Sequence, residues 1–169
     1  MSIEIKISLN NGLYLKEPQD SKLGRNIIKH SILMIDKFGF ESFTFKKLAE
    51  EINSTEASIY RYFENKHLLL LFLVNWYWEW VSYLIGINTI NVEDPKKKLK
   101  IIIHSFVYAS KENPGIDYVN ESKLHGIVIS EGNKAYHTKE VDNENSKGFF
   151  KSYKDLAESV SIVISEINP

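Results

Sequence analysis

The side chains best suited to polar chemistry gather between residues 44 and 66 of this 169-residue sequence. Hydroxyl groups, phenols and amides alternate there with apolar residues, and the cations Lys46, Lys47 and Arg61 would form a local positive patch. Such groups donate hydrogen bonds to phosphate oxygens and so position a protein on a nucleic acid. This segment is therefore a candidate binding surface, and it needs short helices to hold its polar side chains together.

Motifs for catalysis or metal binding are missing from the sequence. The five histidines have neither His-Glu-x-x-His spacing nor cysteine partners, because the chain contains no cysteine. Ser110, Ser122 and Ser130 lack the Gly-x-Ser-x-Gly context of a nucleophile, and no glycine-rich phosphate loop occurs. We expect a protein that is not an enzyme and has no metal site and no cofactor; an enzyme is the second class of function to be tested.

The overall charge gives no sign of a nucleic-acid partner. The formal net charge is -1, and residues 1–86 carry ten Lys or Arg against ten Asp or Glu, so any DNA-binding surface would be a local patch. With 43% hydrophobic residues the chain can bury a core in one or two small domains. The absence of cysteine and of a charged leader before an apolar run leads us to expect a cytoplasmic protein.

The first residues alternate between apolar and other side chains. Isoleucine or leucine stands at every second position from residue 3 to residue 9, and Asn11-Gly12 follows. An Asn-Gly step tolerates the positive φ angles of a tight hairpin turn. The pattern predicts a β-hairpin over residues 3–16.

Helical spacing of apolar residues then predicts a first helix over residues 21–38 and a short second helix capped by Thr44. Asn53 ends the second helix where a positive φ is needed, which asparagine tolerates best among non-glycine residues. Thr55 caps a third short helix, which we expect to end at Phe63. Three short helices with a turn between the second and third have the outline of a helix-turn-helix.

A fourth helix, from Asn65 to about residue 86, is so apolar that a membrane span has to be considered. It holds Asn75 and Glu79 near its middle and its three tryptophans at its centre, whereas a span carries aromatic residues at its ends. A helix buried between two halves of the protein fits better. Further helices are predicted from Asp94-Pro95 onward, over about 119–135 and over about 147–167, with a polar stretch before the last.

The residues from Gly39 to Leu70 resemble the N-terminal DNA-binding signature of the TetR (tetracycline-repressor) family of transcriptional regulators. That signature combines a capping Thr, an apolar-Ala pair, a turn residue, a second cap, an aromatic block and a Lys that opens the fourth helix. It is carried here by Gly39-Phe40, Thr44, Leu48-Ala49, Asn53, Thr55, Ile59-Tyr60-Arg61-Tyr62-Phe63, Asn65-Lys66 and Leu69. After residue 90 the resemblance is only architectural.

The resemblance implies an all-α, ligand-responsive repressor whose third helix enters the major groove of operator DNA. Ala57 and Ser58 would approach base edges, and Tyr60 and Lys66 would contact phosphates. The implied DNA-binding residues are Thr44, Lys46, Thr55, Glu56, Ala57, Ser58, Tyr60, Arg61 and Lys66. The alternative for any one of them is a role in the core or on a solvated face.

Three positions depart from the family pattern. Asn53 replaces a glycine, which its conformation allows, and Ser54 replaces a hydrophobic residue, which weakens the packing of the turn. Glu56 stands where Lys is common; it could stabilise the start of a helix, accept a hydrogen bond from a cytosine amino group, or lower DNA affinity. The alternative function is therefore a helical protein-interaction module of the same fold without operator binding.

The resemblance divides the chain into an N-terminal arm (1–20), a helix-turn-helix domain (21–66) and a helical domain (67–169) for ligand binding and dimerisation. Aromatic pockets with a few polar groups are typical of ligand sites. The side chains expected to line this site are Trp76, Trp80, Tyr83, His104, Tyr108, Tyr118 and His125. The alternative is that they form plain core, and the inducer cannot be identified from the sequence.

The last predicted helix carries apolar residues at alternating intervals of four and three, which is typical of a helix that pairs with a partner. They are Phe149, Tyr153, Leu156, Val160, Val163 and Ile167. The stripe predicts a homodimer interface centred on Leu156 and Val160, unless the chain's own fifth helix covers it. The expected partners are operator DNA, an unknown inducer and a second copy, with no membrane. Because the family continues with one or two further helices, we expect either a piece of a longer chain or a compact variant.

Overall fold

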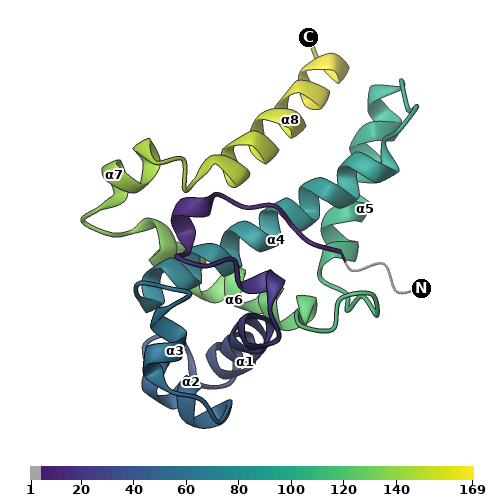
Figure 1. The fold of residues 1–169 in the computed structure, drawn as a ribbon. Helices are drawn as coiled ribbons and strands as arrows, with labels where there is room; N and C mark the ends of the chain where they lie inside the picture. Colours follow the sequence, from purple (N-terminus) through teal and green to yellow (C-terminus); the bar gives the residue numbers. More distant parts are fainter. Residues whose placement is uncertain (1–4) are drawn as a thin grey trace.

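The computed structural model describes residues 5–169, and every regular element in that range is helical. Two 3₁₀ helices, η1 (Asn11–Leu13) and η2 (Pro18–Asp20), come first. They are followed by α1 (Lys22–Phe38), α2 (Phe45–Glu51), α3 (Glu56–Tyr60), α4 (Lys66–Asn88), α5 (Pro95–Ala109), α6 (Glu121–Tyr136), α7 (Val141–Ser146) and α8 (Lys151–Ile167). In Figure 1, α1–α3 gather at one end of the molecule, α5 and α8 extend toward the other, and α4 passes between them. The predicted all-α fold class is confirmed.

The predicted β-hairpin is wrong over the part of it that the structure describes, since residues 3 and 4 lie outside that range. The Asn10 side chain accepts a hydrogen bond from the backbone N–H of Gly12 at 2.9 Å, which tightens the chain into η1. The backbone of Ile7 pairs with a side chain: its N–H donates to Gln19 Oε1 at 3.1 Å, and Gln19 Nε2 donates to its carbonyl at 2.7 Å. The buried amide of Gln19 thus satisfies the groups that a second strand would have paired.

Side-chain caps set the starts of the first helices, as the sequence predicts for Thr44, Thr55 and Asn65. Each of these side chains accepts a hydrogen bond from a backbone N–H three residues later, which would otherwise lack a partner. Asn53 has the predicted positive φ, 51°, and turns the chain from α2 into α3. Helix α3 ends at Tyr60, three residues earlier than predicted.

Helix α4 lies at the centre of the core. Its residues 69–77 are all buried, and the rings of Trp76, Trp80 and Tyr83 stack in series with centroids 5.9 and 5.6 Å apart. Within residues 5–169, α4 alone is long and apolar enough to cross a membrane, but 67% of its most apolar window is buried inside the protein. This burial is what a core helix shows, in line with the sequence prediction.

The polar stretch before the last helix forms a short helix, α7, which the sequence did not predict. Gly148, with a φ of 78°, reverses the chain after it, and α8 begins at Lys151 instead of residue 147. The reversal carries Phe149 and Phe150 into the core, where they are 4% and 7% exposed.

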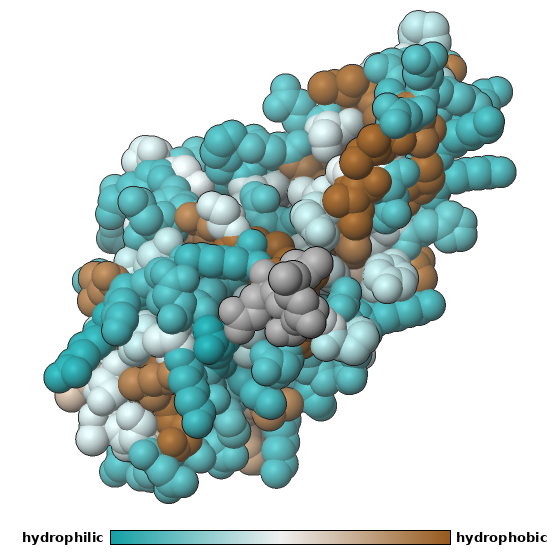
Figure 2. Space-filling view, turned by 45° about the vertical axis from the view of Figure 1, so that its right-hand side comes forward, coloured by the Kyte–Doolittle hydropathy of each residue, from teal (hydrophilic) through white to brown (hydrophobic). Residues whose placement is uncertain are grey.

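The apolar stripe of α8 packs largely inside its own chain. Leu156 is 5% exposed, and Val160 packs against the core at its edge, next to α4 and α5. The prediction of a dimer interface is therefore wrong for Phe149 and Leu156, because a single chain already buries both. Tyr153 is exposed, and Val163 and Ile167 are half-buried. Figure 2 shows hydrophobic side chains on the surface at the end of the molecule formed by α4, α5 and α8.

Candidate functional site

The first candidate site is a solvent-facing surface made by α2, the turn after it and α3. Ile59 and Leu48 are fully buried beneath it, and the ring of Tyr60 packs edge-on against Phe45 with centroids 5.0 Å apart. These contacts fix α3 against α2. The surface carries most of the residues predicted to contact DNA: Thr44, Lys46, Thr55, Glu56, Ala57, Tyr60 and Arg61 are exposed, and Ser58 is half-buried.

Lys66 departs from its predicted role as a phosphate contact. Its ammonium donates to the backbone carbonyls of Phe40 and Phe43, both at 3.1 Å, and lies 3.4 Å from that of Glu41. It also lies over the Phe40 ring, 4.7 Å from the centroid. An ammonium has three protons to donate, and all three are directed to these carbonyls. The structure therefore shows Lys66 holding the loop between α1 and α2, and its contact with a phosphate stays a prediction.

The same loop is held from its other side by α6. The carboxylate of Glu131 accepts a hydrogen bond from the backbone N–H of Phe40 at 3.1 Å. Lys134 bridges Glu131 at 2.7 Å and Glu41 at 3.2 Å. Burial raises the pKa of Glu131, but the hydrogen bonds from Lys134 and Phe40 outweigh it, and the pKa lies below its usual value. Glu131 thus stays a carboxylate, and α6 is tied to the loop that precedes α2.

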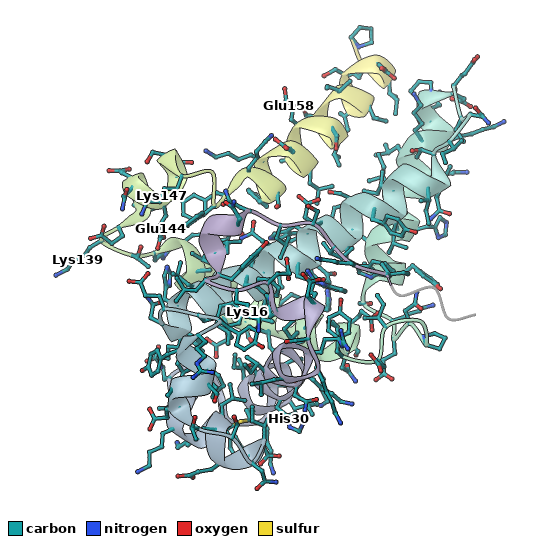
Figure 3. All side chains as sticks on the ribbon, in the orientation of Figure 1. Lys16, His30, Lys139, Glu144, Lys147 and Glu158 are labelled. Carbon is teal, nitrogen blue, oxygen red and sulfur yellow. The ribbon has the colours of Figure 1, made fainter. Side chains whose placement is uncertain are left out.

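A second side-chain contact joins α7 to the start of α4. Glu144, labelled on α7 in Figure 3, is 6% exposed, and its carboxylate lies 2.7 Å from Nε2 of His67. Thr138 donates to the other carboxylate oxygen at 3.3 Å. The α1–α3 unit is therefore attached to the rest of the molecule through α4, α6 and α7.

The residues predicted to bind ligand do not surround one cavity. Trp80, Tyr83, His104 and Tyr108 line an open groove of about 620 Å³ between α4 and α5. The other three lie elsewhere and have structural partners: Trp76 is fully buried and donates to Gln19 Oε1, Tyr118 also bonds Gln19 Oε1 at 3.0 Å, and His125 Nδ1 lies 2.7 Å from the hydroxyl of Tyr77.

A different cavity, of about 450 Å³ and also open to solvent, lies between α4, α6, α7 and α8. Four aromatic rings and two polar side chains line it, together with small apolar residues. The lining comprises Val74, Trp78, Val128, Gly132, Asn133, Tyr136, Val141, Phe150, Tyr153 and Lys154. No group of three His, Asp or Glu side chains in residues 5–169 is arranged to hold a metal ion.

Comparison with known proteins identifies the α1–α3 unit. Residues 27–71, from α1 into α4, match the family described as bacterial regulatory proteins, tetR family. The match to the TetR family is confined to this N-terminal segment. The fold also resembles a crystal structure of AibR in complex with isovaleryl coenzyme A and operator DNA, with a TM-score of 0.61 and 17% sequence identity over 85% of this chain and 72% of that one. No curated protein sequence matches the chain.

The TetR signature covers residues 39–70. It does not include the residues of α6 that bind the loop between α1 and α2. Glu131 and Lys134 lie more than 60 residues beyond the signature, and ordinary charged residues on a predicted helix carry no signal of their own. The predicted ligand residues omit Trp78 although they include Trp76 and Trp80. The three tryptophans alternate around α4, so Trp78 faces α6 and α8 while its neighbours stack within the core.

Proposed function

We propose that this chain is a ligand-responsive transcriptional repressor of the TetR family that binds operator DNA as a homodimer in the cytoplasm and is not an enzyme. The observation that carries the proposal is the surface of α2 and α3. It lies within the TetR match and exposes hydroxyl, phenol and cationic groups from Thr44 to Arg61. Hydroxyls and cations in this arrangement suit phosphate oxygens, and Ala57 leaves room for a base edge.

The solved complex of AibR with isovaleryl coenzyme A and operator DNA supports both parts of the proposal, since one fold there accommodates an effector and DNA. In this chain the cavities lie in the helices beyond residue 66, apart from the α2–α3 surface. The contacts of α6 with the α1–α2 loop and of α7 with the start of α4 give a ligand a physical route to change the placement of α3. Such linkage requires the ligand to bind the free protein more tightly than the DNA-bound protein.

A direct test measures the salt dependence of DNA binding. A fragment is selected from genomic DNA, and its affinity is followed by fluorescence anisotropy at several salt concentrations. We expect Lys46→Ala and Arg61→Ala each to weaken binding to all sequences and to lower the slope of log K against log salt by about one unit for each phosphate that is no longer neutralised. Lys97→Ala, on the exposed side of α5, is the control and should leave the DNA affinity and the salt slope unchanged. A selection that enriches no sequence, with salt-insensitive residual binding, would refute the repressor.

Glu56 is the observation that favours the second candidate, a helical interaction module that does not bind DNA. Its carboxylate is exposed at the first position of α3, where it repels a phosphate. If the repressor proposal holds, Glu56→Lys should raise non-specific DNA affinity and steepen the salt slope by about one unit for each additional phosphate that is neutralised. Glu56→Gln separates the loss of repulsion from the gain of a cation. An interaction module predicts no measurable binding by the wild-type protein or by the Gln variant.

A further inference from the structure

One turn of α6 both lines the cavity between α4, α6, α7 and α8, called the aromatic cavity below, and contacts the α1–α2 loop. Gly132 and Asn133 line the cavity, whereas Glu131 and Lys134 bind Phe40 and Glu41 on the other side of the helix. The open groove between α4 and α5 has no such connection, because its lining contains no residue of α6. A molecule that fills the aromatic cavity therefore presses on the helix that holds the loop preceding α2.

The cavity walls favour a flat aromatic molecule. The Trp78 and Tyr153 rings lie with centroids 5.7 Å apart, and Tyr136 lies 5.1 Å from Phe150 and 6.2 Å from Tyr153. The rings come from α4, α6 and the start of α8, and they contact one another along the wall of the cavity. Aromatic groups attract one another in stacked and edge-on arrangements beyond what the buried area alone gives. A volume of about 450 Å³ accommodates a molecule of two fused rings.

The polar groups of the lining select for negative charge. Lys154 is its one charged side chain, and the partner of its ammonium is the neutral amide of Asn145. None of the ion pairs among residues 5–169 involves Lys154. The Tyr136 hydroxyl accepts from Trp78 Nε1 at 3.2 Å, and its own proton has no acceptor among residues 5–169. Both groups can therefore donate to an anionic oxygen.

We propose that this cavity is the effector site and that it takes a planar aromatic carboxylate, which lies against the rings of Trp78, Tyr136 and Tyr153 with its carboxylate at Lys154. The proposal rests on the ligand response proposed above, but binding to the free protein is measured without DNA. The failure of either proposal is therefore visible separately. If the ligand binds but does not change DNA affinity, the site is supported and the regulation by ligand is refuted. If the protein binds DNA but not the ligand, the ligand site is refuted and DNA binding is not affected.

The decisive variant fills the cavity at Gly132. This glycine is buried, yet a Cβ atom built on it meets nothing within 4 Å, so a side chain there projects into open space. Gly126, on the same helix, also has nothing within 4 Å of its Cβ position, but it is exposed and does not line the cavity. Gly132→Leu and Gly126→Leu therefore form a matched pair with the same change in helix propensity.

The probe is 2-naphthoate, measured by calorimetry and tryptophan fluorescence. Its comparators are the neutral 2-naphthamide, the aliphatic octanoate and the cation benzyltrimethylammonium. We expect 2-naphthoate to bind the wild-type protein and Gly126→Leu within twofold of each other, and at least tenfold more tightly than Gly132→Leu. Each comparator should bind the wild-type protein at least tenfold more weakly than 2-naphthoate. Circular dichroism checks that both leucine variants are folded.

Lys154→Met keeps the test decisive if Gly132→Leu does not fold, because Lys154 is exposed. This variant should bind 2-naphthamide with the affinity of the wild-type protein and should no longer bind 2-naphthoate more tightly than 2-naphthamide. The proposal is overturned if no probe binds the wild-type protein, if the two leucine variants bind 2-naphthoate equally, or if octanoate or the cation binds more tightly than 2-naphthoate.

Discussion

Leu156→Asp is expected to unfold the protein. Leu156 is 5% exposed and packs against the core formed with α4 and α5, so the substitution places a carboxylate among apolar side chains such as Phe106 and Val160. Removing a buried leucine and burying a charge should together cost more than about 4 kcal/mol in the free energy of unfolding, a large part of the total for a domain of this size. Loss of helical circular dichroism at 25 °C is the measurement.

The matched control lies on the same helix. Ile162 and Ile164 of α8 are 53% and 49% exposed, so Ile162→Asp with Ile164→Asp should leave the fold intact. If the proposed homodimer pairs through the exposed side of α8, this double variant should sediment as a monomer and lose operator affinity. A folded, dimeric Leu156→Asp protein would contradict the intramolecular packing of the stripe and restore the interface predicted from its spacing.

The case of α8 shows what a seam pattern can and cannot predict. Intervals of four and three place Leu156 and Val160 on one face of a helix, and the structure keeps them together. The spacing does not say which surface covers that face, because an apolar stripe packs equally well on a second chain or on the same chain. That choice depends on how α4 and α5 lie in space, and residues far away in the sequence decide it.

The sequence predicts local structure correctly where a side chain hydrogen-bonds to backbone groups a few residues away. The caps at Thr44, Thr55 and Asn65 and the positive φ of Asn53 follow from groups within three residues of each other. The N-terminal hairpin failed for the opposite reason. Alternating isoleucines predict an extended chain, but its pairing partner is the side-chain amide of Gln19, 12 residues from Ile7, and no periodicity marks such a partner.

Long-range polar ties account for most of what the sequence could not predict about the candidate site. The TetR signature brings attention to Lys66, but not to the carbonyls of Phe40 and Phe43 that its ammonium meets more than 20 residues earlier. A lysine at the start of a helix suits a phosphate as well as a carbonyl by charge alone. The choice between them depends on how closely the α1–α2 loop approaches α4.

Lys66→Met should destabilise the α1–α3 unit by about 2 kcal/mol, because hydrogen bonds to a charged group are worth about 1.5–3 kcal/mol and the half-buried carbonyls of Phe40 and Phe43 would lose their partner. Lys47→Met is the matched control. The Lys47 ammonium donates to one carbonyl, that of Ser42 at 2.8 Å, and the side chain is exposed, so its loss should cost less than about 0.5 kcal/mol. Urea unfolding followed by circular dichroism gives both values.

DNA binding by the same variant decides between the two roles of Lys66. If its ammonium holds the loop, Lys66→Met weakens operator binding through misplacement of α2 and α3, and the salt slope at temperatures where the variant is folded stays at the wild-type value. If it binds a phosphate, the slope falls by about one unit per phosphate while the stability is unchanged. The three carbonyls within 3.4 Å of Nζ leave the ammonium no free proton for a phosphate, so the first outcome is expected.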